Sequence, residues 1–208
     1  MYGLSITTQP AAEPVTLTEA KTQLGIAAAD TSNDTKITAL ISAARRHFES
    51  RTHRALIHRT LTFTSDYFPS TDTLLALPWA PLSSVTSVKY YDADGNQQTW
   101  NSANYLAITN REPGGIALKY GVAWPTIRWQ PQAVEIVYVA GHAASVTTAV
   151  PQEAIHAIKI LIDHWFEATG VVAQASLQSI PFSVEALIEQ CRVGDDFLCY
   201  GEDRFLTR

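Results

Sequence analysis

The sequence predicts an α+β fold in which helices near both ends of the chain flank an inserted antiparallel β region. Apolar residues recur at helical spacing before residue 56 and again after residue 150, a pattern typical of amphipathic helices. Between these segments the period changes to two, and proline recurs often, at Pro69, Pro78, Pro81, Pro113, Pro125 and Pro131. Because proline interrupts strand pairing, we expect short antiparallel strands in a small sheet or barrel.

Two helices are predicted before the β region. The first covers "VTLTEAKTQLGI", where Thr16 and Glu19 have the spacing of a capping box, and it ends at Gly25. The second covers "DTKITALISAARRHFESRTHR", and its apolar residues share one stripe: Ile37, Leu40, Ile41, Ala44 and Phe48. We therefore expect a long amphipathic helix that packs against the rest of the protein.

The β region begins near Ile57, where apolar and polar residues start to alternate. Further strand candidates are TLLAL, SVTSVKYY, NYLAIT, GIALKY and AVEIVYVAG. The segment "YYDADGNQQTW" predicts a hairpin, because Asp94, Gly95 and Asn96 tolerate positive φ angles. Its aspartates do not predict a calcium loop, since Gln97 and Ala103 stand where an EF-hand requires glycine and glutamate.

The helix predicted after Pro151 carries polar residues that raise the question of a catalytic or metal site: His156, Lys159, Asp163, His164 and Glu167. Its apolar residues form one broad face, so the charged residues face solvent. His156 and His164 are separated by roughly 12 Å along the helix, too far to share one metal ion. Lys159 and Asp163 can form a solvent-facing ion pair. A second helix, "SVEALIEQCR", follows a Ser/Gln-rich linker.

Other enzyme signatures are also missing from the sequence. It contains no Gly-rich phosphate loop and no GxSxG nucleophile elbow. A hydrolase or metal enzyme is supported only by scattered histidines, so we expect no catalytic residue, metal or cofactor. Cys191 and Cys199 fit neither a redox pair nor a zinc site and are predicted to be unpaired thiols.

Charge and hydropathy narrow the class of protein. The net charge of −5 disfavours a protein that binds many DNA phosphates. No stretch approaches the roughly 18 apolar residues of a membrane span, and the N-terminus lacks a signal-peptide pattern. We expect a protein of the cytoplasm or of an assembly built there.

A basic cluster surrounds the end of the second helix: Arg45, Arg46, Arg51, Arg54 and Arg59. Such a cluster could contact DNA phosphates, an acidic partner or another subunit. Cations at a helix C-terminus also complement the helix dipole, which is the commoner role. These arginines carry the alternative hypothesis of a DNA-binding accessory protein of genome packaging.

Six blocks of the sequence, in order, resemble the head-to-tail connector (adaptor) proteins of long-tailed bacteriophages, which are often described as possible DNA-packaging proteins. The blocks are "LTEAKTQLGI", "DTKITALISAARRHFESRTHRALI", "LPWAPLSSVTSVKYYDADG", "IVYVAGHA", "VPQEAIHAIKILIDHWFE" and "IPFSVEALIEQCRV". Together they span roughly residues 16 to 193. No single block is diagnostic, but their ordered combination is specific.

The resemblance implies a mainly helical bundle with an inserted small antiparallel β region and an extended C-terminal arm. The expected divisions are an N-terminal extension (1–15), a bundle core (16–56 and 150–192), a β insertion (57–149) and the arm (193–208). The chain continues about fifteen residues beyond "CRV", further than the family pattern. The charged and aromatic residues of this tail are the expected portal contacts: Asp195, Asp196, Phe197, Tyr200 and Phe205.

The resemblance also implies a non-enzymatic ring protein of the virion neck, assembled in the host cytoplasm. The ring would lie below the portal protein, with twelve copies to match it, and would extend the channel through which double-stranded DNA passes. Its other side would bind the next neck (stopper) or tail protein. No membrane partner is expected.

Overall fold

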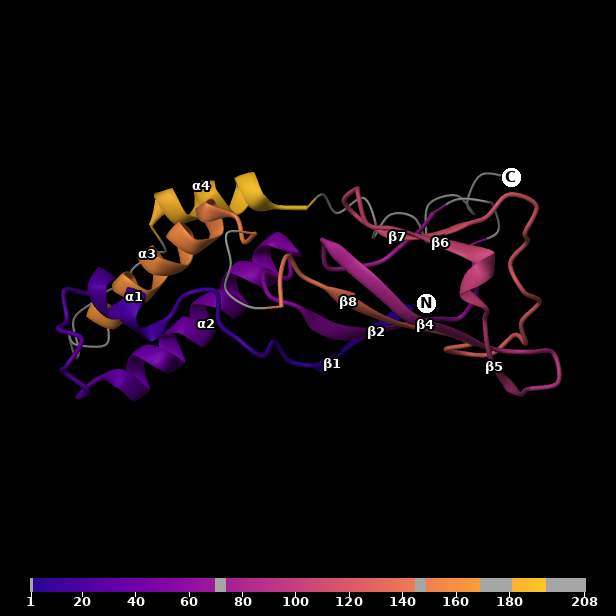
Figure 1. Ribbon diagram of the computed structural model, residues 1–208, viewed down its shortest axis with the longest axis horizontal. Coiled ribbons are helices and arrows are strands. Elements are labelled where there is room, and N and C mark those ends of the chain that lie inside the picture. Colours follow the sequence, from indigo (N-terminus) through magenta and orange to yellow (C-terminus); the bar gives the residue numbers. More distant parts are fainter. Residues whose placement is uncertain (1, 70–73, 145–148, 169–180, 194–208) are drawn as a thin grey trace. The chain divides into compact units, whose positions relative to one another are not determined.

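The computed structural model in Figure 1 describes residues 2–69, 74–144, 149–168 and 181–193. The chain divides into two compact units. One, which we call the helical unit, comprises residues 11–57 and 143–192. The other, the β unit, comprises residues 2–10 and 58–142, together with Val193. Each unit combines segments that lie far apart in the sequence, because the chain leaves the helical unit after Ile57 and returns to it at Ala143.

Four α-helices build the described part of the helical unit: α1 (Leu17–Gln23), α2 (Asp34–Thr52), α3 (Gln152–Ala168) and α4 (Phe182–Cys191). The two central helices, α2 and α3, pack against each other and against both shorter helices. All four helices predicted from periodicity are therefore confirmed, with bounds that differ by a few residues.

The core of the helical unit is aliphatic, with one large aromatic residue. Ile37 and Phe48 of α2, Ile158 and Leu161 of α3, and Ile188 of α4 are all fully buried. The residues of α2 and α3 lie on the apolar faces predicted for these two helices. Burying a side chain of this size contributes about 1.5–3 kcal/mol, so the stripes account for the packing of the helices.

The helix ends follow the sequence signals. Thr16 caps α1 through its hydroxyl, which accepts from the Glu19 backbone N–H, while the Glu19 carboxylate accepts from the Thr16 backbone N–H at 2.9 Å. This is the predicted capping box. At the other end of the long helix, His53 adopts the left-handed conformation with φ of 55° and so ends α2.

Two antiparallel sheets build the β unit. The larger has the order β1-β2-β8-β4-β5, formed by Tyr2–Thr8, Arg59–Ser65, Val134–Ala140, Leu82–Tyr91 and Gln97–Thr99. The smaller has the order β3-β7-β6, formed by Leu75–Ala76, Gly115–Leu118 and Tyr105–Ile108. A short 3₁₀ helix, Ser102–Asn104, precedes β6. The predicted hairpin joins β4 to β5, with Tyr91 opposite Gln97 and a positive φ of 88° at Gly95.

The centre of the larger sheet is buried on one face. Strands β2 and β8 alternate between buried and partly exposed residues along their whole length. Leu61 lies opposite Tyr138, and Phe63 lies opposite Ile136. The Tyr138 hydroxyl, inside this core, donates to the Pro78 carbonyl at 2.7 Å. Burial raises the pKa of Tyr138 far above its ordinary value, so the hydroxyl stays protonated and keeps this hydrogen bond.

The expectation of a mainly helical bundle is wrong. About 32% of the described residues are helical and about 28% are strand, so the protein is α+β with nearly equal shares. The β region is not a small insertion into a bundle but a compact unit with two sheets of its own. A physical reason is that the N-terminal residues add a strand: β1, Tyr2–Thr8, pairs with β2 along its length.

Candidate interaction surfaces

The polar residues of α3 do not come together as an active site. His156 and Glu167 are exposed, and Asp163 and His164 are partly exposed. The Lys159 ammonium lies 3.2 Å from Glu19 of α1, so its ion pair is made to another helix rather than along α3. Within the described residues, no three His, Cys, Asp or Glu side chains lie close enough to hold a metal ion. The arrangement is that of a solvated helix face.

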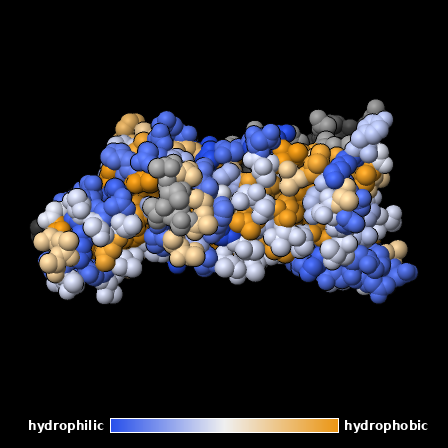
Figure 2. Space-filling view, viewed as in Figure 1, coloured by the Kyte–Doolittle hydropathy of each residue, from blue (hydrophilic) through white to orange (hydrophobic). Residues whose placement is uncertain are grey.

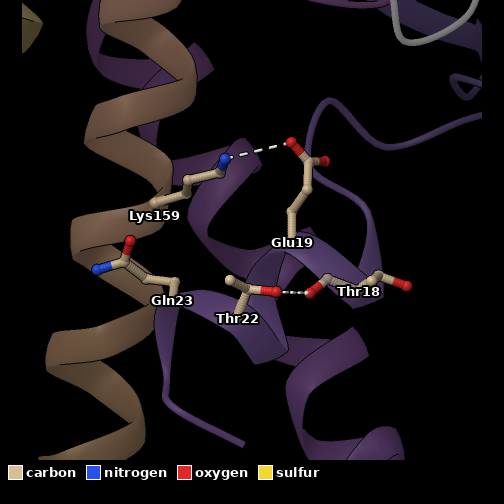
Figure 3. Close-up of a pocket in the computed structure, with 5 residues that line it drawn as sticks. All are labelled: Thr18, Glu19, Thr22, Gln23 and Lys159. Carbon is tan, nitrogen blue, oxygen red and sulfur yellow. Dashed lines mark hydrogen bonds and ion pairs between the residues drawn. The ribbon is translucent and has the colours of Figure 1, made fainter. Parts of the chain in front are cut away.

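A shallow polar pocket lies beside this ion pair (Figure 3). Its lining comes from α1 and α3: Thr18, Glu19, Thr22, Gln23 and Lys159. Hydrogen bonding to the Thr16 backbone N–H holds the pKa of Glu19 below its ordinary value, with further lowering by Lys159, despite partial burial. The two charges of the lining therefore neutralise each other, and the pocket offers no net charge to an ionic ligand.

Arg45, the first arginine of the basic cluster, is buried rather than available to a partner. Its Nε donates to Glu13 at 2.6 Å, and its Nη1 donates to Glu49, four residues along α2, at 2.8 Å. Burial lowers the pKa of Arg45, but the hydrogen bond with Glu13 and the charges of both carboxylates outweigh it and raise the pKa above its ordinary value. Arg45 is therefore permanently charged within the fold.

Glu49 extends this buried network beyond α2. Its Oε1 accepts from the Leu56 backbone N–H at 2.9 Å, past the end of the helix. The network thus ties the segment before α1, the body of α2 and the segment after α2 to one another. Removing one member would leave buried charge without its partner, which is strongly destabilising.

Three further arginines of the cluster are engaged inside their own units. Arg51 forms an ion pair at 2.9 Å with Glu185 of α4. Arg54 donates to the Cys191 carbonyl at the C-terminal end of α4, where helix carbonyls lack intrahelical donors. Arg59, in the β unit, places its guanidinium 4.8 Å from the centre of the Trp79 ring.

Arg46 is the remaining member of the cluster and is exposed. The part of the chain that the structure describes contains no ion pair to it. The cluster therefore does not form one basic surface, and the structure does not support the DNA-binding alternative.

Cys191 is buried and forms no disulfide, and burial raises the pKa of its thiol; Cys199 lies outside the described residues.

The β unit exposes large hydrophobic residues at its surface. Tyr120 and Trp129 lie on the connection between β7 and β8 and are almost fully exposed. Tyr2, Leu4 and Ile6 on β1 are between 37% and 49% exposed. Figure 2 shows hydrophobic surface over the strand-rich part of the chain. Aromatic residues of this kind are typical anchors of protein–protein contacts.

Sequence reasoning missed these surfaces. In β1, Tyr2, Leu4 and Ile6 alternate with small and polar residues, and this period of two could have predicted the strand. No comparable signal exists for Trp129, because an exposed and a buried tryptophan look the same in a sequence.

The five expected portal contacts, Asp195, Asp196, Phe197, Tyr200 and Phe205, lie outside the described residues. No helix among the described residues is long and apolar enough to cross a membrane.

Comparisons with known proteins point to one family. The sequence model of the phage gp6-like head-tail connector proteins matches residues 14–98. Among solved structures, a chain from the neck of an empty gene transfer agent (GTA) particle, computed with C6 symmetry, has a TM-score of 0.75 at 25% identity. The match covers 92% of this chain and 96% of that chain. No curated protein sequence matches the chain significantly.

Two further solved structures agree. A chain from the virion of a native GTA particle has a TM-score of 0.73 at 25% identity and covers 92% of this chain and 95% of that chain. A chain from the neck of a native GTA particle, computed with C12 symmetry, has a TM-score of 0.68 at the same identity, covering 92% and 96%. The sequence match and the matches across the fold confirm the resemblance of this chain to the phage head-tail connectors, a family of structural proteins.

Proposed function

We propose that this chain is a ring-forming connector of the neck of a phage-like particle, located below the portal. The observation that carries the proposal is the structural match to neck proteins over 92% of the chain, which includes residues of both units. In this role the ring extends the DNA channel and offers a docking platform to the next neck or tail protein. The chain would be assembled into the particle in the host cytoplasm.

Ring formation is supported by the symmetry of the similar necks. Two of the matching chains come from necks computed with C6 and C12 symmetry. A ring of identical subunits needs a head-to-tail contact between two different surfaces of the chain, repeated until the rotation closes. We propose twelve copies per ring, in register with the portal.

Passage of DNA through the ring is consistent with the charges of the chain. The net charge is −5, and four of the five arginines of the basic cluster interact with groups of their own unit. Protein that binds DNA tightly neutralises phosphates with exposed cations. A channel that lets DNA move has no need of such contacts.

The portal contact is proposed to lie in residues 194–208, with Asp195, Asp196, Phe197, Tyr200 and Phe205 as its main residues. Aromatic anchors supply much of the energy of protein contacts, and this segment holds three of them together with four acidic residues, of which Asp195 and Asp196 come directly before Phe197. The segment follows α4 and Val193 directly in the sequence.

The test is the native mass of the chain mixed with the portal protein of the same genome. The full chain should give a discrete complex with many copies of this protein. A chain truncated after Val193 should not bind, nor should one in which residues 194–208 are replaced by an equally long Gly/Ser segment. Portal binding by the truncated chain would exclude the C-terminal contact, and the absence of any complex with the full chain would contradict the connector proposal.

A further inference from the structure

Strand β1 leaves one edge of the larger sheet open. On one side it pairs with β2, from Tyr2 opposite Ser65 to Thr8 opposite Thr60. On its other side, no strand pairs with it in the part of the chain that the structure describes. Unpaired N–H and C=O groups of an edge strand form a template for another strand.

The sequence of β1 lacks the features that usually protect such an edge. Exposed edge strands in soluble proteins commonly carry charged residues or proline, which discourage pairing with another chain. The strand reads "YGLSITT" and contains neither. The only irregularity is a shift in register between Ile6 and Thr8. The edge is therefore open to a partner over most of its length.

The side chains of β1 also leave apolar surface uncovered. Tyr2, Leu4 and Ile6 alternate along the strand and so share one face. They lie opposite Ser65, Phe63 and Leu61 of β2 in the register of the sheet. The Tyr2 ring stacks on Phe63, with ring centres 6.0 Å apart. While Phe63 is 7% exposed, Leu4 is 37% exposed and Ile6 is 42% exposed.

We propose that β1 is a subunit contact: its open edge pairs with the neighbouring copy of this chain, and the contact covers Leu4 and Ile6. This inference rests on the proposed ring. It places the head-to-tail contact in the β unit and names the strand that forms one side of it.

The opposite end of the same sheet supplies the complementary surface. Strand β5 pairs only with Lys89–Tyr91 of β4. The earlier residues of β4 pair with β8 on one side, and no strand pairs with them on the other within the described residues. This stretch, "LSSVTS", also carries no charge. Two uncharged ends of one sheet can join without desolvating a charge, and two different ends give the head-to-tail contact that a ring requires.

The first test replaces the apolar residues of β1 by a cation. The variant L4K/I6K keeps a strand-compatible backbone but puts two charges into the proposed contact. The matched control is Leu106→Lys, because Leu106 is also a partly exposed leucine, 47% exposed, on an edge strand, β6, of the smaller sheet. The control should form the complex with the portal that the unchanged chain forms. L4K/I6K should require at least about tenfold more protein to complete the ring, because both cations would lose water in the contact.

The second test needs no variant and uses hydrogen exchange of the backbone amides. In the full complex with the portal, amides of β1 and of residues 82–87 should exchange more slowly than in the free chain. In a second sample the portal protein is in large excess over the chain, so that each bound copy has no neighbouring copy. Under that condition β1 should exchange as fast as in the free chain, because its partner is another copy.

The outcomes separate this inference from the proposed function. If the unchanged chain forms no ring, the proposed function fails. If a ring forms and L4K/I6K assembles at the same concentration as the unchanged chain, or if exchange at either end of the sheet is unchanged, only the β1 contact is wrong. Slow exchange of β1 in isolated bound copies would also overturn it, because the partner would then be the portal.

Discussion

The two units of this protein differ in where they place their charged and apolar residues. The helical unit buries charge: Arg45, Glu49 and Lys21 are almost inaccessible and are paired within the unit. The β unit exposes apolar residues: among the large hydrophobic residues exposed in the described part of the chain, only Phe182 belongs to the helical unit. The helical unit thus pairs its buried charges internally, whereas the β unit leaves several large apolar residues exposed.

This difference affects two free energies, that of folding and that of assembly. An exposed apolar side chain costs the monomer little, since most protein surfaces contain some, but a group of them gains from burial in an assembly. A buried ion pair, in contrast, is costly to disturb because one charge remains without a partner. Substitutions in the helical unit should therefore act mainly on stability, and substitutions of exposed residues in the β unit mainly on assembly.

The largest expected effect tests whether the β unit has a stable core of its own. Trp100 is 7% exposed, and its ring lies 5.4 Å from that of Tyr105 and 5.2 Å from that of Trp124. Trp100→Ala should lower the free energy of unfolding by about 3–5 kcal/mol, because it leaves a cavity among aromatic rings. Urea unfolding followed by fluorescence measures this, since four of the five tryptophans lie in the β unit.

The matched control is Trp129→Ala. Trp129 is 94% exposed, so its removal should change the free energy of unfolding by less than about 0.5 kcal/mol. Equal effects of the two substitutions would show that the β unit does not divide into a packed interior and a free surface.

Arg45→Met should have the next largest effect and tests the buried charges of the helical unit. It removes the guanidinium that pairs at 2.8 Å with Glu49, which is 1% exposed. We expect a loss of about 3 kcal/mol, at the lower end for broken buried pairs, because the Glu13 side chain is 32% exposed and remains hydrated. Urea unfolding followed by far-ultraviolet circular dichroism reports on the helices. Arg46→Met, one residue away on the exposed side of α2, should have almost no effect; similar losses for both would contradict the structural role of the network.

A smaller effect is expected from the capping box of α1. Thr16→Ala removes the hydroxyl that accepts from the Glu19 backbone N–H, and such changes cost about 1 kcal/mol. Thermal unfolding followed by circular dichroism should show a lower midpoint. Thr18→Ala, at an exposed position inside the same helix, serves as the control. If Thr16→Ala were neutral, α1 would be held by packing alone.

The smallest effect concerns pH. Burial holds the pKa of His47 below its ordinary 6.5, and Arg51 lowers it further, partly opposed by Glu185. The folded protein therefore binds a proton at His47 less readily than the unfolded chain does. Its contribution to stability is fully present above about pH 6.5 and is lost as the pH falls through the folded pKa. His47→Phe should flatten the stability curve in this range, whereas His156→Phe, at an exposed site, should not; an unchanged slope in His47→Phe would exclude His47 as the cause.

Much of the fold could be predicted from the sequence because its signals are local. The capping box of Thr16 and Glu19, the apolar stripe of α2 and the Asp94–Gly95–Asn96 turn depend on residues a few positions apart. The pairing of β1 with β2 escaped prediction, although β1 itself alternates with a period of two, because the two strands lie more than fifty residues apart in the chain. The share of helix was overestimated for the same reason: a sheet becomes visible only when distant strands are paired.

The sequence by itself determined the order of the helices and central strands, the absence of enzyme signatures and the resemblance to connector proteins, since each of these depends on residue spacing or on ordered blocks. Only the tertiary structure decided how the arginines are used. Arg45 and Arg46 are neighbours in the chain, yet one is buried between two carboxylates and the other is exposed. Trp100 and Trp129 differ in the same way, because the first is buried and the second is exposed. Charge and hydrophobicity belong to a residue, but burial depends on segments brought together from distant parts of the chain, and burial determines whether a side chain stabilises the fold or remains available to a partner.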